Sequence, residues 1–172
     1  MEMLFVIDAK DYEKDWPVIE KTTVRAVIER DGLFACQRNK LGEYKIPGGG
    51  PDPGESLQDA LIREVRDEMG FILDTSYIEP IGQIDEFRED AFRKGKTFVR
   101  HTFFYRCRIL EETGKTNMTK SEIALGFTPA WADIDTIIRE NRLCMVEKWN
   151  IRDTEFFVWL KKQRENTDVY RG

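Results

Sequence analysis

The segment PGGGPDPGESLQDALIREVRDEMGF, residues 47–71, constrains the fold more than any other part of the sequence. Its glycines and prolines exclude regular structure up to Glu55, because proline removes a backbone donor and glycine favours no single conformation. Ser56 then has the residue type of a helix N-cap, Asp59 follows it at capping-box spacing, and Gly70 is suited to end the helix. The segment therefore predicts a loop followed by a helix over residues 57–69.

Acidic side chains gather along one side of this expected helix. At about 100° per residue, Asp67 and Glu68 lie within roughly 60° of Glu64. The neighbouring stripe is apolar and suited to burial against a sheet: Leu61, Val65 and Met69. Carboxylates at this spacing repel one another, so they form either a solvated face neutralised by Arg63 and Arg66 or a site for a divalent cation. The preceding glycine loop favours the cation, because it lets backbone carbonyls approach a ligand closely.

The rest of the chain predicts an α/β fold in which strands outnumber helices. Turn residues at 30–32 separate two apolar, alternating runs and indicate a hairpin. The expected strands are residues 24–29, 33–37, 44–46, 77–87 and 97–109, and the expected helices after the first are residues 133–141 and 154–165. This order favours a mixed, largely antiparallel sheet with helices packed against it.

Composition excludes several classes of protein. The 172 residues favour one domain, with 1–20 as an extension or strand and 150–172 as a C-terminal helix and tail. The net charge of -5 disfavours coating of nucleic acid or of an anionic membrane. The apolar run at 3–7 is too short for a signal peptide or a membrane span, and the three cysteines have no metal-ligand or disulfide pattern. A cytoplasmic location is therefore expected, and dimerisation through the N-terminal strand is compatible with the sequence.

The acidic segment also matches a known motif. Gly49, Glu55, the run Arg63-Glu64-Val65, the pair Asp67-Glu68 and the pair Gly70-Phe71 have the spacing of the Nudix box. From average residue frequencies, a chance match in a chain of this length is expected on the order of once in 10⁷. The chain therefore resembles the MutT-like Nudix hydrolases over residues 49–71. The resemblance implies an α/β/α sandwich and hydrolysis of a nucleoside diphosphate linked to another moiety, with Mg²⁺ or Mn²⁺ as cofactor.

The resemblance also implies roles for individual residues. The metal ligands would be Gly48, through its carbonyl, Glu64, Asp67 and Glu68. The catalytic set would be Glu55, Arg63, Glu64 and Glu68, in which Arg63 and Glu55 orient the carboxylates and Glu64 is a ligand or general base. The family usually has Glu where this chain has Asp67, so the shorter side chain predicts a weaker or water-mediated metal contact.

Family members often add an acidic ligand from outside the box, and Glu122 is the preferred candidate here, ahead of Glu86 and Glu89. A surface acid that caps a helix is the alternative for Glu122. His101 lies within an expected strand, where a packed or hydrogen-bonded side chain is favoured over a substrate contact.

Three residues are predicted to bind substrate: Arg88, Arg100 and Phe127. The two arginines belong to a basic cluster at an expected strand connection, which is either a solvated hairpin tip or a phosphate-binding surface. Phe127 either stacks on a base or belongs to the core.

The expected substrate is a small nucleotide, and a nucleoside triphosphate is favoured by elimination. Subgroups that act on ADP-ribose carry a proline at the position of Asp85 or Glu86, and Pro80 comes too early. Subgroups for dinucleoside polyphosphates carry a tyrosine slightly further on, where this chain has only Phe87 nearby. Two alternatives remain: an RNA 5′-end pyrophosphohydrolase, and a Nudix-fold sensor that binds a nucleotide without cleaving it.

Overall fold

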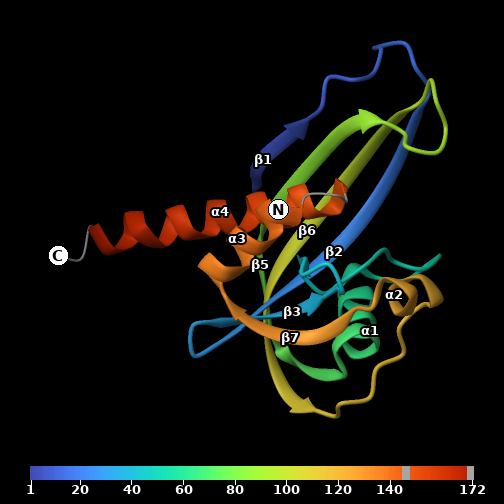
Figure 1. Cartoon of the computed structure of the whole chain (residues 1–172). Coiled ribbons are helices and arrows are strands. Elements are labelled where there is room, and N and C mark those ends of the chain that lie inside the picture. Colours follow the sequence, from blue (N-terminus) through green and yellow to red (C-terminus); the bar gives the residue numbers. More distant parts are fainter. Residues whose placement is uncertain (145–147, 170–172) are drawn as a thin grey trace. The chain divides into compact units, whose positions relative to one another are not determined.

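The computed structural model describes residues 1–144 and 148–169 (Figure 1). Contacts within the chain define two compact units, each made of two segments. Unit 1 consists of Met1–Ile28 and Pro47–Thr116, and unit 2 consists of Glu29–Ile46 and Asn117–Gly172. Among the described helices, none is both long and apolar enough to cross a bilayer.

Unit 1 is a mixed sheet covered by one helix. Its elements are β1 Met3–Asp8, most of β2 Val18–Arg30, α1 Leu57–Met69, β5 Phe71–Glu89 and β6 Thr97–Glu112. The strand order is β1-β5-β6-β2, in which β5 and β6 are antiparallel while β1 pairs with β5, and β2 with β6, in parallel. The long strands run side by side in Figure 1, and α1 packs against β5.

The core of unit 1 forms where the helix meets the sheet. Leu61, Val65 and Met69 of α1 are at most 1% exposed, so the apolar stripe expected from the sequence is the buried face of the helix. Ile84 of β5 and Phe104 of β6 are fully buried as well. Burial of this stripe fixes which side of α1 carries the acidic residues.

In the part that the structure describes, unit 2 contains a smaller sheet and three helices. Its elements are β3 Leu33–Arg38, β4 Tyr44–Lys45, α2 Lys120–Leu125, β7 Thr128–Asp133, α3 Ile134–Cys144 and α4 Lys148–Val169. The end of β2 turns through Asp31 and Gly32 into β3, which pairs in antiparallel fashion with β4 and β7. Phe34 and Phe157 meet edge to face at 5.2 Å between ring centroids and anchor α4 on β3.

The expected fold class is confirmed: the chain has an α/β structure with a mixed, largely antiparallel sheet and flanking helices. The 57–69 helix and the β2–β3 hairpin are also confirmed. The later helices are longer than predicted, and the tail at 170–172 lies outside the described residues.

Two elements were not predicted. The strand β7 contains Pro129, which is tolerated because β7 pairs only with β3 among the described strands. The helix α2 spans only six residues, too few for a periodic pattern, although its capping box of Thr119 and Glu122 was a readable signal.

Two of the three cysteines are buried. Burial raises the pKa of Cys107 to about 12 and raises that of Cys36 well above its usual value. Cys144 is half-buried, and its thiol donates a hydrogen bond to the Leu41 carbonyl.

Candidate active site

Helix α1 begins and ends at the residues that its sequence indicates. The hydroxyl of Ser56 accepts a hydrogen bond from the Asp59 backbone N–H at 3.1 Å. At the other end, Gly70 takes the left-handed conformation with φ 68° and its N–H bonds to the Arg66 carbonyl. These two caps define the helix between them and therefore the positions of its acidic residues.

The glycine loop before α1 runs along one edge of β2. The Val24 N–H donates to the Gly49 carbonyl, and the Ala26 N–H donates to the Pro47 carbonyl, both at 2.9 Å. Between them, Gly48 has φ +136°, and a Cβ built there would lie 2.1 Å from the Val24 carbonyl oxygen. Only glycine fits at this position, because any side chain would force the loop away from the strand.

Two of the predicted acids lie against this loop. The Gly48 N–H donates to Oε2 of Glu68 at 2.7 Å, and Glu68 is only 2% exposed. A Cβ on Gly49 would lie 2.4 Å from Oε1 of Glu64. The Glu64 carboxylate therefore occupies space that a side chain at position 49 would fill. Glu64 and Glu68 therefore contact consecutive residues of one loop from one face of α1.

Arg63 connects these acids to the start of the box. Its guanidinium donates to both carboxylate oxygens of Glu55, at 2.8 and 2.7 Å, and to Oε1 of Glu64 at 2.7 Å. A further bond to the Gly50 carbonyl, at 3.0 Å, ties the arginine to the loop. The planar fork of arginine suits this arrangement, because it can bind one carboxylate with two donors and still reach a second.

This pairing changes the acidity of both partners. Hydrogen bonds from Arg63, and then from the Asp52 backbone N–H, lower the pKa of Glu55 to about 2. The hydrogen bond to Glu55 in turn raises the pKa of Arg63 above its usual range, and Glu64 contributes in the same direction. Glu55 and Arg63 are therefore an ion pair at neutral pH, and the pair holds Glu64 in place.

Asp67 is not part of this arrangement. Its carboxylate lies 3.8 Å from the Arg66 guanidinium, and its side chain is 25% exposed. Among the described residues, no three His, Cys, Asp or Glu side chains come close enough together to form a metal-binding group. The side chains of Glu64 and Glu68 nevertheless supply the oxygen donors that hard divalent cations prefer, beside a loop of backbone carbonyls. Metal binding by this set stays a prediction.

Arg88 and Arg100 line a cavity of about 490 Å³ within unit 1. Both guanidinium groups lie over the ring of Phe98, at 4.2 and 5.0 Å from its centroid. Gly50, which follows the two loop glycines that contact the acids, also lines the cavity. The structure thus places both arginines in a hollow that reaches the loop of the box, and substrate binding by them stays a prediction.

The other two predicted site residues belong to unit 2. Glu122 forms the capping box of α2 with Thr119 and an ion pair with Lys45 at 3.2 Å. Phe127 is 6% exposed, and the Lys45 ammonium lies 5.5 Å from its ring centroid. These contacts resemble those of a helix cap and a core aromatic residue, and roles in metal or substrate binding stay predictions.

Three further candidates lie on β5 and β6. His101 has its Nδ1 at 2.9 Å from Oδ1 of Asp85, as expected for a hydrogen-bonded strand histidine. Glu86 is buried, and Glu89 accepts a hydrogen bond from the Gly95 N–H.

Lys21 and Phe92 line the arginine cavity but were not predicted as site residues. Lys21 lies in the first half of β2, which lacks a clear strand pattern. Phe92 lies in the loop that joins β5 to β6, where the surrounding charged residues indicate only a solvated turn. The Asp90 side chain, which caps this loop, was the one local signal for an ordered structure there.

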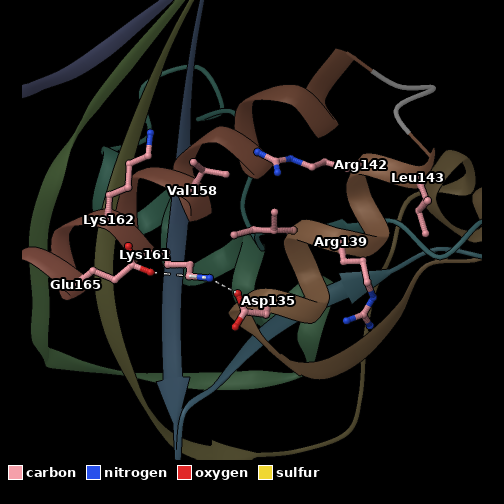
Figure 2. Close-up of a pocket in the computed structure, with 9 residues that line it drawn as sticks. Asp135, Arg139, Arg142, Leu143, Val158, Lys161, Lys162 and Glu165 are labelled. Atoms are coloured by element: carbon pink, nitrogen blue, oxygen red, sulfur yellow. Dashed lines mark hydrogen bonds and ion pairs between the residues drawn. The ribbon is translucent and has the colours of Figure 1, made fainter.

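A second cavity, of about 600 Å³, lies between α3 and α4 in unit 2 (Figure 2). Its lining combines apolar side chains, Val158 among them, with four cationic ones: Arg139, Arg142, Lys161 and Lys162. Lys161 is paired with Asp135 at 2.6 Å and lies 3.9 Å from Glu165, as the dashed lines in Figure 2 show. None of the predicted site residues is among the described residues that line it.

Comparisons with known proteins identify relatives over just under half of the chain. Two proteins called nucleoside triphosphatase NudI, from Enterobacter sp. (strain 638) and Escherichia coli (strain K12), are 31% and 34% identical to the chain over 84 and 83 residues. Each alignment covers 45% of this chain, and the chain spans only about 60% of the length of these relatives.

Solved structures show the same fold. A NUDIX hydrolase from Nitrosomonas europaea superposes with a TM-score of 0.59 at 22% identity, over 80% of this chain and 87% of that one. The MutT protein from Methanosarcina mazei Go1 gives a TM-score of 0.53 at 20% identity, over 90% and 99% of the two chains. The NUDIX domain family matches the chain over residues 20–160, which is most of its length. The chain therefore belongs to the NUDIX family.

Proposed function

We propose that the chain is a metal-dependent pyrophosphohydrolase that cleaves the phosphoric anhydride bond of a nucleoside diphosphate linked to another moiety. The observation that carries this proposal is the arrangement of α1 and its loop. Glu68 accepts the Gly48 N–H, and Arg63 holds Glu64 beside Gly49. A purely solvated acidic face needs neither a glycine at these two positions nor an arginine shared between two carboxylates.

Mg²⁺ or Mn²⁺, when bound, would polarise the phosphoryl oxygens and lower the pKa of a coordinated water. The chain would hold the cation through the carboxylates of Glu64, Asp67 and Glu68 and the Gly48 carbonyl. These acids alone would repel a pyrophosphate, so the proposed activity requires the cation.

The chain's own residues supply orientation and a proton acceptor. Arg63 binds Oε1 of Glu64, and we assign Oε2 of the same carboxylate as the acceptor of the proton from the attacking water. Glu55 keeps Arg63 in this position through its two hydrogen bonds. The buried Glu68 is fixed by the Gly48 N–H, so its free energy of reorganisation during the reaction is small.

A nucleoside triphosphate is the proposed substrate. The relatives that share about a third of their aligned residues carry the name nucleoside triphosphatase, and the proline typical of ADP-ribose subgroups is absent from the corresponding position. The cationic cavity beside Gly50 is also compatible with the 5′ end of an RNA, which is the second candidate.

We further propose that the two units form a single Nudix domain over residues 1–172 in a cytoplasmic protein. The family match over residues 20–160 contains segments of both units, which supports this organisation. Dimerisation through β1, which among the described strands pairs only with β5, stays a prediction.

A substrate panel tests the proposed function. Release of phosphate and pyrophosphate is measured from ribonucleoside and deoxyribonucleoside triphosphates, nucleotide sugars, dinucleoside polyphosphates and 5′-triphosphate RNA, with Mg²⁺ or with a chelator. We expect Mg²⁺-dependent pyrophosphate release, fastest with a nucleoside triphosphate. Faster turnover of the RNA would favour the second candidate. Tight nucleotide binding without turnover of any substrate would instead identify a sensor and contradict the enzymatic proposal.

A further inference from the structure

The cavity beside Gly50 is strongly cationic although the chain as a whole is acidic. Four basic side chains line it: Lys21, Arg88, Arg93 and Arg100. Asp90 is the one acidic residue of the described lining, and its Oδ1 already accepts the N–H groups of Phe92 and Arg93, at 2.9 and 2.7 Å. A chain with net charge -5 thus presents a local excess of positive charge, which favours a ligand with more than one negative charge.

The two strand arginines are held in fixed positions. Arg88 lies opposite Phe98 in the β5–β6 pairing, and Arg100 follows Phe98 by two residues, so all three side chains share one face of the sheet. Both guanidinium groups stack on the Phe98 ring, and Nη1 of Arg88 donates to the Glu89 carbonyl at 2.9 Å. Nε of Arg88 is buried without a hydrogen-bond partner among the described residues. A pre-organised, partly unsatisfied guanidinium is suited to bind a phosphate.

Phe92 contributes a feature that phosphate binding alone does not explain. Its side chain is 95% exposed, yet it lies at the cavity and in an ordered loop. Asp90 binds two backbone N–H groups of this loop, and the Asp90 N–H bonds to the Lys96 carbonyl at 2.8 Å. Holding an aromatic ring in water is unfavourable because its apolar surface stays hydrated. A planar ligand group stacked on the ring would remove part of this surface from water and so recover that free energy.

Few side chains of the lining can accept a hydrogen bond from the edge of a base: among the described lining residues, only Thr22, Thr23 and Asp90 carry side-chain oxygens. The Oγ1 of Thr23 lies 3.0 Å from Oγ1 of Thr102, and Asp90 is occupied by the loop. Arginine and lysine side chains donate but cannot accept hydrogen bonds. A base held here would therefore be recognised by its flat face, and every base has one.

We propose that this cavity binds the nucleoside monophosphate half of the substrate, with Arg88 and Arg100 on its phosphate and Phe92 stacked on its base. The proposal rests on the proposed function. A phosphate in this cavity lies near Gly50, whose carbonyl bonds to Arg63, so the rest of the phosphate chain can extend toward the acids of α1. Recognition by stacking makes the enzyme tolerant of the base, with purines bound more tightly than pyrimidines because of their larger face.

Equilibrium binding tests this proposal without any need for turnover. The ligands are AMP, ribose 5-phosphate, which lacks the base, and adenosine, which lacks the phosphate, each titrated into the full chain by NMR or calorimetry without metal. Phe92→Ala is expected to weaken AMP binding about tenfold and to leave ribose 5-phosphate unchanged, whereas Phe92→Tyr retains AMP binding. The double variant Arg88→Gln with Arg100→Gln is expected to weaken AMP and ribose 5-phosphate at least tenfold and adenosine much less.

Two matched controls lie on β6 outside the cavity. Leu110→Ala removes an exposed apolar side chain, and Arg106→Gln removes an exposed positive charge; neither is expected to change AMP binding. Equal binding of AMP to wild type and to all cavity variants would overturn the proposal, as would an equal effect of Phe92→Ala on AMP and on ribose 5-phosphate. Cavity-dependent AMP binding in a protein that hydrolyses nothing would refute the proposed function and leave this inference standing.

Discussion

Each unit of the chain contains an arginine that is paired with a carboxylate, and the two pairs lie in opposite surroundings. In unit 1, the side chains of Arg63, Glu55 and Glu64 keep between 15% and 27% of their surface exposed. In unit 2, the side chains of Arg152 and Asp153 are fully buried, at 2.8 Å from each other.

The two carboxylates differ in their hydrogen bonds and in their access to solvent. Both oxygens of Asp153 are used inside unit 2: Oδ1 accepts from Arg152, and Oδ2 accepts the Ile46 N–H at 2.8 Å. Glu64 instead shares its arginine with Glu55 and stays within reach of solvent. Removing one partner of a buried pair destabilises the fold, because it leaves the other charge buried. The accessible Glu64 carboxylate remains able to bind a metal or a proton.

The largest expected effect on stability comes from breaking the buried pair. Asp153→Asn removes a buried charge that pairs with Arg152, so we expect the free energy of unfolding to fall by about 3–5 kcal/mol. Urea denaturation measures this change. Asp135→Asn, which breaks the exposed pair with Lys161, serves as the control and should cost less than about 1 kcal/mol. Similar losses in the two variants would show that burial does not distinguish the pairs.

Arg63→Lys is expected to lower activity more than stability, the reverse of what is expected for Asp153→Asn. Lysine cannot bind Glu55 with two donors and Glu64 with a third, so we expect kcat to fall about tenfold while the free energy of unfolding changes by less than about 1 kcal/mol. Arg139→Lys is the matched control, because Arg139 also pairs with the next residue of its helix, Glu140 at 3.2 Å. A large loss of stability with unchanged kcat would mean that Arg63 is structural.

The smallest expected effect is on the titration of Glu55. Its pKa is lowered from 4.5 to about 2, so the stabilisation from its pairing with Arg63 is complete above pH 4.5 and is lost as the pH falls toward 2. NMR titration of the Glu55 carboxyl carbon measures the midpoint directly. A midpoint near 4.5 would show that the pair does not persist in solution.

Local sequence predicted those parts of the site that depend on neighbouring residues. The Ser56 cap, the apolar stripe and Gly70 together define α1, so its bounds were predicted correctly. Pairing of Arg63 with Glu55 was implied only by the resemblance to the family, and the structure supplies its geometry.

The arginine cavity was less predictable, because it depends on contacts between distant segments. Lys21, Gly50 and Phe92 meet there only after β2 has paired in parallel with β6 and the loop of the box has paired with β2. No local pattern specifies a parallel pairing between strands so far apart in the chain. The strand β7 was missed for a different reason: Pro129, Ala130 and Ala132 give this strand a weak signal.

Hydrolysis by Glu68→Gln tests the central claim most directly. Glutamine retains the shape and an oxygen that can accept the Gly48 N–H, so this contact is preserved while the charge is lost. With saturating Mg²⁺ and the best substrate of the panel, we expect kcat to fall about 10³-fold, whereas Glu79→Gln, on the exposed part of β5, leaves it unchanged. Full activity in a folded Glu68→Gln variant would contradict the assignment of the α1 acids as the catalytic metal site.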